Sequence, residues 1–391
     1  MEQQPFRAGE LSLGWPAELV TAELARLMDL APVATVRTDG SGPLDAHRWC
    51  KEVEHFLREA FHGDAPVQEW DAVRSAAGGD HADLSSGREI AWLRDLRTLI
   101  EELPGPRPRP VYWTQRRGSS APRIFGLRET ARAFAEVVGA LEEAGYLVWA
   151  FGQACVDQPR PGVLGEDPAD AVHDALGRTG LWPPAAHHTT YTRDDLADVI
   201  EFLAHHVRRP TRSYRHDYAD CGRHFDGFEP VRGLQLYRVR INDVLRLSDL
   251  GLELNESGLL EQAAPVGLGS LVDDSLAGPS VHTADADELR HAVEQFRARD
   301  ASALDMRHAV IALSGILERR RALVSEKMLS KDAGELFRIA NGYGIRHQKA
   351  DQKADYDPRL YLEWTFYLFL GAIHLTDRII AGQERPGPGE E

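Results

Sequence analysis

Apolar residues recur at the three- and four-residue spacing of an amphipathic helix through most of the chain. In the N-terminal part this periodicity predicts three helices, at 16–30, 44–61 and 88–103. The stretch 104–110, PGPRPRP, cannot continue a helix because proline lacks an amide hydrogen and fixes its own backbone. We therefore expect residues 1–103 to form a helical N-terminal region.

The pattern is mixed between residues 111 and 261. Helical spacing returns in three segments, at 128–144, 168–177 and 193–206. The apolar run 146–151 and the alternating segment 234–247 are typical of strands. Together these elements predict an α+β middle domain over 111–261. Residues 262–284 are small, aperiodic and interrupted by glycine and proline, so we expect a linker there.

Four helical segments follow this linker, at about 285–299, 303–327, 331–344 and 358–381. Their short connections favour antiparallel neighbours, which is the topology of an up-and-down four-helix bundle. The fold class predicted for the whole chain is therefore mainly α with an α+β middle, ending in a helical bundle over 285–381.

The last of these helices carries two apolar stripes. One stripe consists of Leu360, Trp364, Leu368, Gly371, Leu375 and Ile379. The other consists of Leu362, Phe366, Phe369, Ile373 and Ile380. A helix that is apolar on two sides is usually buried on both. The bundle covers one side, and we expect a second copy of the chain to cover the other, giving a homodimer or a higher homo-oligomer.

Composition limits the classes of function. The 391-residue chain has a formal net charge of −16, which argues against a general nucleic-acid coat or a protein that binds acidic membranes. Residues 319–353 depart from this balance, with nine lysines and arginines against four aspartates and glutamates. A solvated helix face and a local site for a polyanion both fit such a cluster.

Cysteine usage and hydropathy indicate a cytoplasmic protein. The three cysteines, Cys50, Cys155 and Cys221, lie far apart in the sequence, and an odd number favours reduced thiols. The N-terminus has neither the basic segment nor the apolar segment of a secretory signal. The most apolar run, 364–375, is shorter than the roughly 20 residues that a membrane span needs.

The segment 340–347, ANGYGIRH, stands where the third predicted helix of the bundle meets the fourth. A bundle with asparagine, arginine and histidine in this place, before a long apolar last helix, resembles the HEPN family. The resemblance covers only residues 285–381, about a quarter of the chain. It implies a dimeric helical bundle that cleaves RNA without metal or cofactor, as in abortive-infection, toxin-type and other antiviral defence systems.

The resemblance also suggests roles for individual residues. His347 would be the general acid or base, since histidine titrates in the right range, and Arg346 would stabilise charge on the phosphoryl oxygens. Asn341 would orient the reacting groups. The family pattern has an arginine before this asparagine, whereas Ala340 stands there in this chain. Contacts to the RNA backbone are expected from four further cations, Lys331, Arg338, Lys349 and Lys353.

In this hypothesis the N-terminal and middle regions regulate the bundle, either by sensing a phage-derived trigger or by binding an antitoxin or another partner protein. A non-catalytic HEPN-like module for dimerisation or nucleotide binding is the first alternative, and Ala340 favours it. A purely structural role is also open, because Arg346 and His347 fit the C-terminal end of a helix, where cations interact well with the helix dipole.

A second alternative comes from histidines and a cysteine in the middle domain. The spacing of His216, Cys221 and His224 is compatible with three zinc ligands, with a fourth from His205 or His206. This pattern predicts a metal-dependent hydrolase, although His205 and His206 also fit a helix end. A nucleophilic pair of Cys221 and His216 is a further reading of the same residues. The preferred ribonuclease hypothesis requires no metal.

Overall fold

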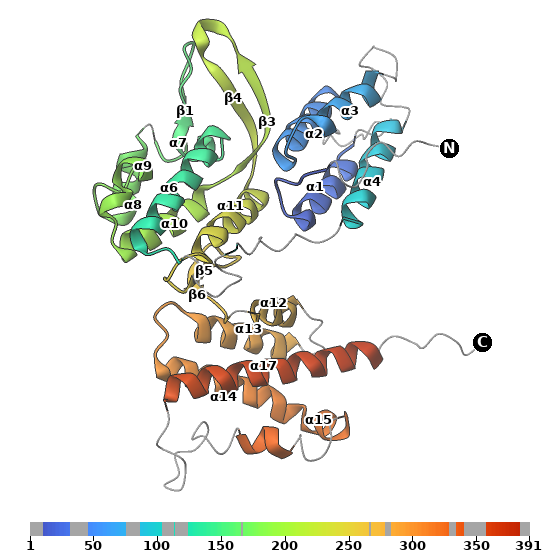
Figure 1. The fold of residues 1–391 in the computed structure, drawn as a ribbon, viewed down its shortest axis with the longest axis vertical. Helices are drawn as coiled ribbons and strands as arrows, with labels where there is room; N and C mark the ends of the chain where they lie inside the picture. The colour runs from blue at the N-terminus through green and yellow to red at the C-terminus, as the bar shows by residue number, and fades with distance from the viewer. Residues whose placement is uncertain are drawn as a thin grey trace, which may run out of the picture. The chain divides into compact units, whose positions relative to one another are not determined.

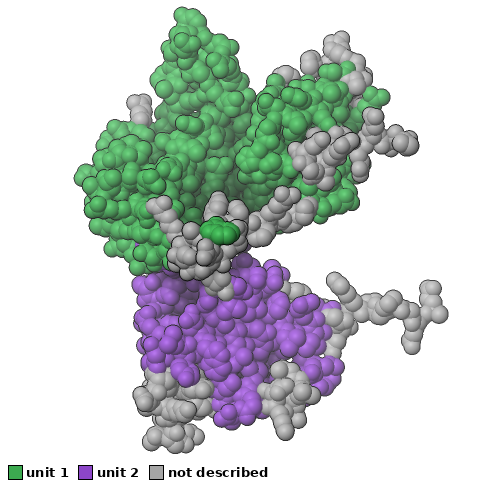
Figure 2. All heavy atoms as spheres, viewed as in Figure 1, with its two compact units in different colours: residues 1–249 green, residues 250–391 purple. Residues whose placement is uncertain are grey.

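The computed structural model describes residues 11–31, 46–75, 87–103, 113, 124–165, 167–265, 267–277, 283–327, 334–339 and 357–383. The chain divides into two compact units, Met1–Asp249 and Leu250–Glu391 (Figure 2). We call them unit 1 and unit 2. The described residues are mostly helical, and the sheets among them have two strands each. The prediction of a mainly α chain is confirmed.

The described residues of unit 1 begin with helices α1 (Ala17–Asp29), α2 (Ala46–Ala60), α3 (Ala65–Ser75) and α4 (Arg88–Glu101) (Figure 1). The periodicity predicted α1, α2 and α4, whereas α3 was not expected. Large aromatic side chains fill the core between them, because each helix turns one apolar face inward. Trp49 on α2 meets Trp70 on α3 edge to face, with ring centroids 5.7 Å apart.

The rest of unit 1 contains helices α6 (Leu127–Glu143), α7 (Val148–Phe151), α8 (Pro168–Leu176), α9 (Pro184–His187), α10 (Arg193–His206) and α11 (Pro230–Leu245). Both strand predictions in this region are wrong, because 146–151 leads into α7 and 234–247 belongs mostly to α11. Proline at the first position and the side chain of Glu229, which accepts from two backbone amides, start α11 as a helix. Its buried residues then follow helical spacing, at Gly233, Leu236, Tyr237, Ile241 and Leu245.

Within the described ranges the strands form three antiparallel pairs, β1 (Gly152–Gln153) with β2 (Arg160–Pro161), β3 (Arg209–His216) with β4 (Gly222–Glu229), and β5 (Leu252–Leu254) with β6 (Leu260–Gln262). The first two pairs lie in unit 1 and the third in unit 2. The β3–β4 hairpin is long, and its tip extends away from the helices of the unit (Figure 1).

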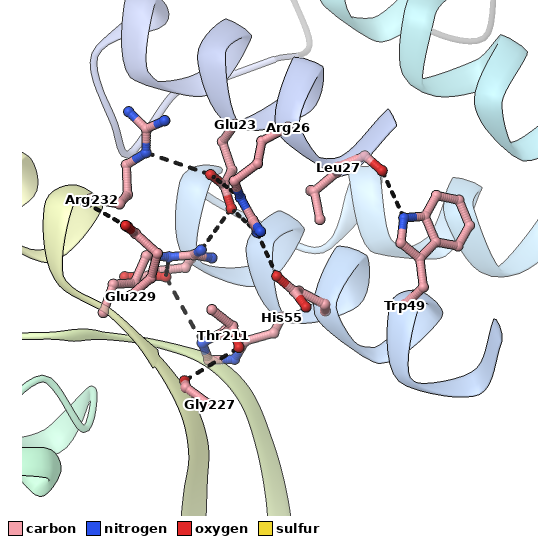
Figure 3. Close-up of polar contacts among 12 residues, drawn as sticks. Glu23, Arg26, Leu27, Trp49, His55, Thr211, Gly227, Glu229 and Arg232 are labelled. Atoms are coloured by element: carbon pink, nitrogen blue, oxygen red, sulfur yellow. Dashed lines mark hydrogen bonds and ion pairs between the residues drawn. The ribbon is translucent and has the colours of Figure 1, made fainter. Parts of the chain in front are cut away.

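A buried network of charged groups joins α1, α2 and β3 (Figure 3). The Arg209 guanidinium has no exposed surface and donates to Glu23 Oε1 at 2.8 Å and to Glu59 Oε2 at 2.9 Å. Arg26 donates to the same Glu23 carboxylate at 2.7 Å. Burial alone would raise the pKa of Glu23, but the Arg26 hydrogen bond and the charges of Arg209, Arg26 and Arg232 hold it below the usual value. The base of the hairpin is therefore fixed to the N-terminal helices by ion pairs.

Unit 2 consists mainly of helices α12 (Gly269–Ala277), α13 (Thr283–Arg297), α14 (Ala303–Arg319), α15 (Arg321–Lys327) and α17 (Pro358–Gln383). Helices α13 and α17 pack on α14, and α12 packs on α17, around one apolar core. The segment 262–284, predicted as a linker, contains α12. Residues 334–339 are helical, within the third helix predicted for the bundle, and 340–356 lie outside the described residues.

The helix predicted at 303–327 is interrupted at Arg320, where α14 ends and α15 begins. The Arg320 side chain is buried and donates to Asp377 Oδ1 and to Thr376 Oγ1, both at 2.7 Å. It also donates to Asp285 Oδ2 at 3.2 Å. These contacts come from helices far along the chain, so the periodicity of the segment does not predict the break.

The two apolar stripes of α17 lie in different surroundings. The second stripe is buried in the core of unit 2 at Leu362, Phe366, Phe369 and Ile373. The first stripe has exposed members, with 62% of Leu360, 47% of Trp364 and 44% of Leu375 accessible. Among the described residues, no helix combines the length and the apolar character needed to cross a membrane.

Candidate metal centre

Four potential metal ligands converge at the tip of the β3–β4 hairpin. They are Cys155, His216, Cys221 and His224, and their ligand atoms all lie within 4.8 Å of one another. Cys155 Sγ is 3.7 Å from His216 Nδ1, and Cys221 Sγ is 3.0 Å from His224 Nε2. Two sulfur and two nitrogen donors so placed are the ligand set of a tetrahedral zinc site.

The register of the hairpin places the two histidines. Tyr214 pairs with His224, and His216 pairs with Gly222, so that both histidines lie on the same face near the tip. They are diagonal neighbours, and their ring centroids are 5.5 Å apart. On the opposite face the same alternation places Arg209, Ser213, Arg215 and Arg223.

Cys221 is brought to the histidines by a tightly wound turn. Ala219 and Asp220 have φ angles of 50° and 55°, and Gly222 has a φ of 95°. The left-handed conformation costs a non-glycine residue about 1–2 kcal/mol. Such strain is maintained only where surrounding contacts compensate for it, and a metal ion bound to His216 and Cys221 would do so across the turn.

Cys155 reaches the hairpin from the short β1–β2 sheet. The side chain of Gln153 in β1 donates to the Arg223 carbonyl at 2.6 Å and accepts from the Phe225 amide at 3.2 Å, so it binds the edge of β4. Gly162 lets the backbones approach closely, because a Cβ there would lie 2.1 Å from the Ala150 carbonyl oxygen. Cys155, two residues after Gln153, is thereby held beside the hairpin tip.

The surroundings of Cys155 favour its thiolate. Backbone amides of Gln158 and Asp157, followed by the side chains of Cys221 and His216, hold the pKa of the Cys155 thiol below its ordinary value, although desolvation opposes this. Amide hydrogens directed at a cysteine sulfur stabilise the negative charge that a metal-bound thiolate carries. The loop after β1 is thus suited to present a metal-binding sulfur.

The two histidines are oriented by neighbouring side chains. His216 Nε2 lies 3.3 Å from Asp157 Oδ2, which leaves Nδ1 directed at Cys155. A carboxylate behind a histidine is the usual support for a histidine that binds metal, because it fixes the tautomer and raises the basicity of the ligand nitrogen. His224 is buried and stacks on Tyr214, with ring centroids 5.3 Å apart.

The geometry fits zinc. With the usual Zn–S and Zn–N bond lengths, tetrahedral coordination places sulfur and nitrogen about 3.6 Å apart and two sulfurs about 3.8 Å apart. The largest separation in the cluster, up to 4.8 Å, requires a contraction of about 1 Å, within the reach of side-chain rotations. Four protein ligands leave no open coordination position, which is typical of a structural site rather than a catalytic one.

The sequence predicted three of these ligands and missed the fourth. His216, Cys221 and His224 come together as their spacing suggested, but the expected fourth ligand, His205 or His206, is wrong. His206 Nδ1 instead lies 2.7 Å from the Phe202 carbonyl oxygen, where it ends α10. The fourth donor is Cys155, 61 residues before His216, and no local spacing could have indicated it.

The proposed ribonuclease residues lie largely outside the described part of the chain. These are Asn341, Arg346, His347, Lys349, Lys353 and Lys331. Arg338 is described, is exposed and pairs with Glu335 at 2.6 Å.

The other described cations of the basic segment 319–353 also have carboxylate partners. Arg319 and Arg320 pair with Asp285, Arg321 with Glu318, and Lys327 with Glu326. Their charge is therefore offset locally. A polyanion surface on this segment would depend on residues beyond the described ones.

Comparison with known proteins gives no family for this chain. No family model matches it, and no curated protein or solved structure shows significant similarity.

Proposed function

We propose that unit 1 is a zinc-stabilised module in which Cys155, His216, Cys221 and His224 bind one structural Zn²⁺. The observation that carries this proposal is the convergence of two thiols and two imidazoles from three separate segments on one point. The amides that face the Cys155 sulfur and the carboxylate of Asp157 behind His216 support it further. Both features are expected around metal ligands, whereas a chance cluster of polar side chains would have neither.

The ion would fasten the loop after β1 to the tip of the hairpin. Tyr214 and Tyr218 near the tip are largely exposed, so the ion would add a cross-link where these side chains face solvent. Zinc prefers sulfur and nitrogen donors in a tetrahedral arrangement, whereas magnesium and calcium prefer oxygen. The donor set therefore favours zinc, and four protein ligands give the ion a structural role instead of the metal-dependent hydrolysis expected from the sequence pattern.

Elemental analysis of the purified protein tests this proposal. We expect about one zinc per chain in the wild type, because a closed four-ligand site retains its ion through purification. Cys155→Ser and Cys221→Ser should each lose most of the zinc. Cys50→Ser is the matched control, because Cys50 is buried among the N-terminal helices, and it should keep the full amount. Wild-type protein without zinc, or with Cys155 and Cys221 joined in a disulfide, would contradict the proposal.

For unit 2 we propose, as a second function, the metal-independent ribonuclease expected from the HEPN resemblance. The exposed apolar stripe of α17 favours it, since a second copy of the chain would cover Leu360, Trp364 and Leu375. In such a dimer His347 and Arg346 would act on one phosphate, and Asn341 would orient them. The paired cations of α14 and α15 do not contribute to this proposal.

Incubation of purified protein with total RNA in magnesium-free buffer tests the second function. Cleavage should fall by about two to four orders of magnitude in His347→Ala, the usual contribution of a general acid or base. Cys221→Ser should cleave as the wild type does, which separates this activity from a metal-dependent hydrolase in unit 1. Equal cleavage by the wild type and His347→Ala would contradict the ribonuclease assignment.

A further inference from the structure

Basic side chains line a cavity on the face of the β3–β4 hairpin opposite to the proposed zinc ligands. A cavity of about 240 Å³ opens between α2 and the β3–β4 hairpin. Its lining includes Lys51 and Arg58 from α2 and Arg215 and Arg223 from the hairpin, and Glu54 is the only carboxylate among the lining residues that the structure describes. Four cations around one carboxylate stand out in a chain whose net charge is −16.

The charge of these cations is only partly offset. Lys51 and Arg58 share Glu54, at 3.1 and 3.0 Å. Arg215 pairs with Asp217 at 2.5 Å, outside the cavity lining, with both side chains mostly exposed. Arg223 forms no ion pair with any residue that the structure describes. Its guanidinium is therefore available for an anion, and the other cations add to the positive potential around it.

The lining also includes neutral polar groups. His55 is 9% exposed and lies with its Nδ1 3.2 Å from Ser213 Oγ, while its Nε2 has no hydrogen-bond partner. Burial, and next the charge of Arg209, lower the pKa of His55 to about 4, so its imidazole is neutral at physiological pH. Which of these two groups donates depends on the imidazole tautomer. With the hydrogen on Nδ1, His55 donates to Ser213 Oγ, and the Ser213 hydroxyl hydrogen is then available to a ligand oxygen.

We propose that this cavity binds a phosphate dianion, either free or as a monoester, through Arg223, Lys51 and Arg58, with Ser213 as a neutral donor. Guanidinium groups bind phosphate oxygens in pairs, and an ammonium adds a compact positive charge. The cavity is larger than a phosphate ion alone, which leaves room for the first atoms of a monoester. The described residues that line this cavity include none of the proposed zinc ligands, so the phosphate site is tested separately from the zinc site.

Isothermal titration of the full-length protein tests the site with inorganic phosphate, AMP and adenosine, at constant ionic strength set with chloride. We expect phosphate and AMP to bind and adenosine not to bind. Saturation by AMP but not by phosphate would identify the monoester as the ligand. Equal binding of AMP and adenosine, or no saturation by either anion at about 10 mM, a concentration that corresponds to very weak binding, would overturn the proposal.

Variants locate the binding. Arg223→Ala should weaken phosphate or AMP binding at least about tenfold, which corresponds to about 1.4 kcal/mol, and Ser213→Ala should weaken it less. Arg246→Ala is the matched control, because Arg246 is an exposed arginine of the same unit that pairs with Asp243. Each variant should keep the wild-type unfolding midpoint and its zinc. Wild-type affinity in Arg223→Ala would place the anion elsewhere and refute the assignment.

Discussion

Replacing Arg209 by methionine is expected to lower the free energy of unfolding of unit 1 by about 3–5 kcal/mol. Arg209 is fully buried and pairs with both Glu23 and Glu59. Removing it leaves two carboxylates in the interior without their shared cation, and an uncompensated buried charge is far more destabilising than the loss of a surface pair. The same change also removes the stacking of Arg209 on the Trp15 ring.

This destabilisation should depend on pH in a defined direction. The pKa of Glu23 in the folded protein lies below its ordinary value of 4.5, so the ion pair stabilises the fold fully at neutral pH and less as pH falls below that value. In the Arg209→Met variant the Glu23 carboxylate has lost one cation, and its pKa should rise. The difference between wild type and variant should therefore be largest at neutral pH and smaller in acid.

Tryptophan fluorescence during urea unfolding measures this effect, since seven of the eight tryptophans belong to unit 1. Arg97→Met is the matched control. Arg97 pairs with Glu101 on the surface of α4 at 2.8 Å, and its loss should change stability by less than about 1 kcal/mol. A similar small change for Arg209→Met would mean that the network in Figure 3 does not fasten the hairpin to the helices.

Removal of zinc is expected to lower the thermal unfolding midpoint of unit 1 by roughly 10 °C. An ion that binds only the folded state stabilises it by about 4 kcal/mol when its free concentration exceeds the dissociation constant a thousandfold. A strong chelator should remove this stabilisation, and excess zinc should restore the unfolding midpoint. Acid should release the ion as well, because protons compete with zinc for the two thiolates and the two imidazoles.

Titration of the thiols in the native protein measures the loss of zinc independently of thermal unfolding. Without chelator, few thiols should react, because Cys50 is buried and a zinc-bound sulfur is protected. With chelator, Cys155 and Cys221 should become reactive. Full reactivity of both before chelation, or an unchanged midpoint after it, would contradict a structural zinc. The Cys50→Ser variant should behave as the wild type in both measurements.

Much of the helical content follows from the sequence, because periodicity is a local property. The helices of the N-terminal region repeat their apolar residues on one face, and the predicted segments match α1, α2 and α4. The segment 234–247 misled the prediction because its apolar residues satisfy both a two-residue and a helical period. Glu229 and Pro230 start the helix, and both lie before residue 234, where the apolar pattern begins.

The β3–β4 hairpin could not be predicted from the periodicity of its residues. Strands β3 and β4 carry charged and aromatic residues on both faces, so they show no apolar alternation. One face supplies the metal ligands and the other supplies buried ion pairs and the basic cavity. The spacing of His216, Cys221 and His224 was visible because the turn is short. Cys155 could not be recognised as a ligand from its spacing. It is placed by the contacts of Gln153 with β4, a strand far along the chain.

The hairpin also makes the two proposed sites interdependent. Arg215 directly precedes His216, and Arg223 directly precedes His224, so two of the cavity cations share backbone with two of the zinc ligands. A zinc ion that orders this backbone would also orient the guanidinium groups of Arg215 and Arg223 on the opposite face. By thermodynamic reciprocity, any gain in anion affinity upon metal loading is matched by an equal gain in metal affinity upon anion binding. The alternation of side chains along these strands would thus couple zinc binding on one face to phosphate binding on the other.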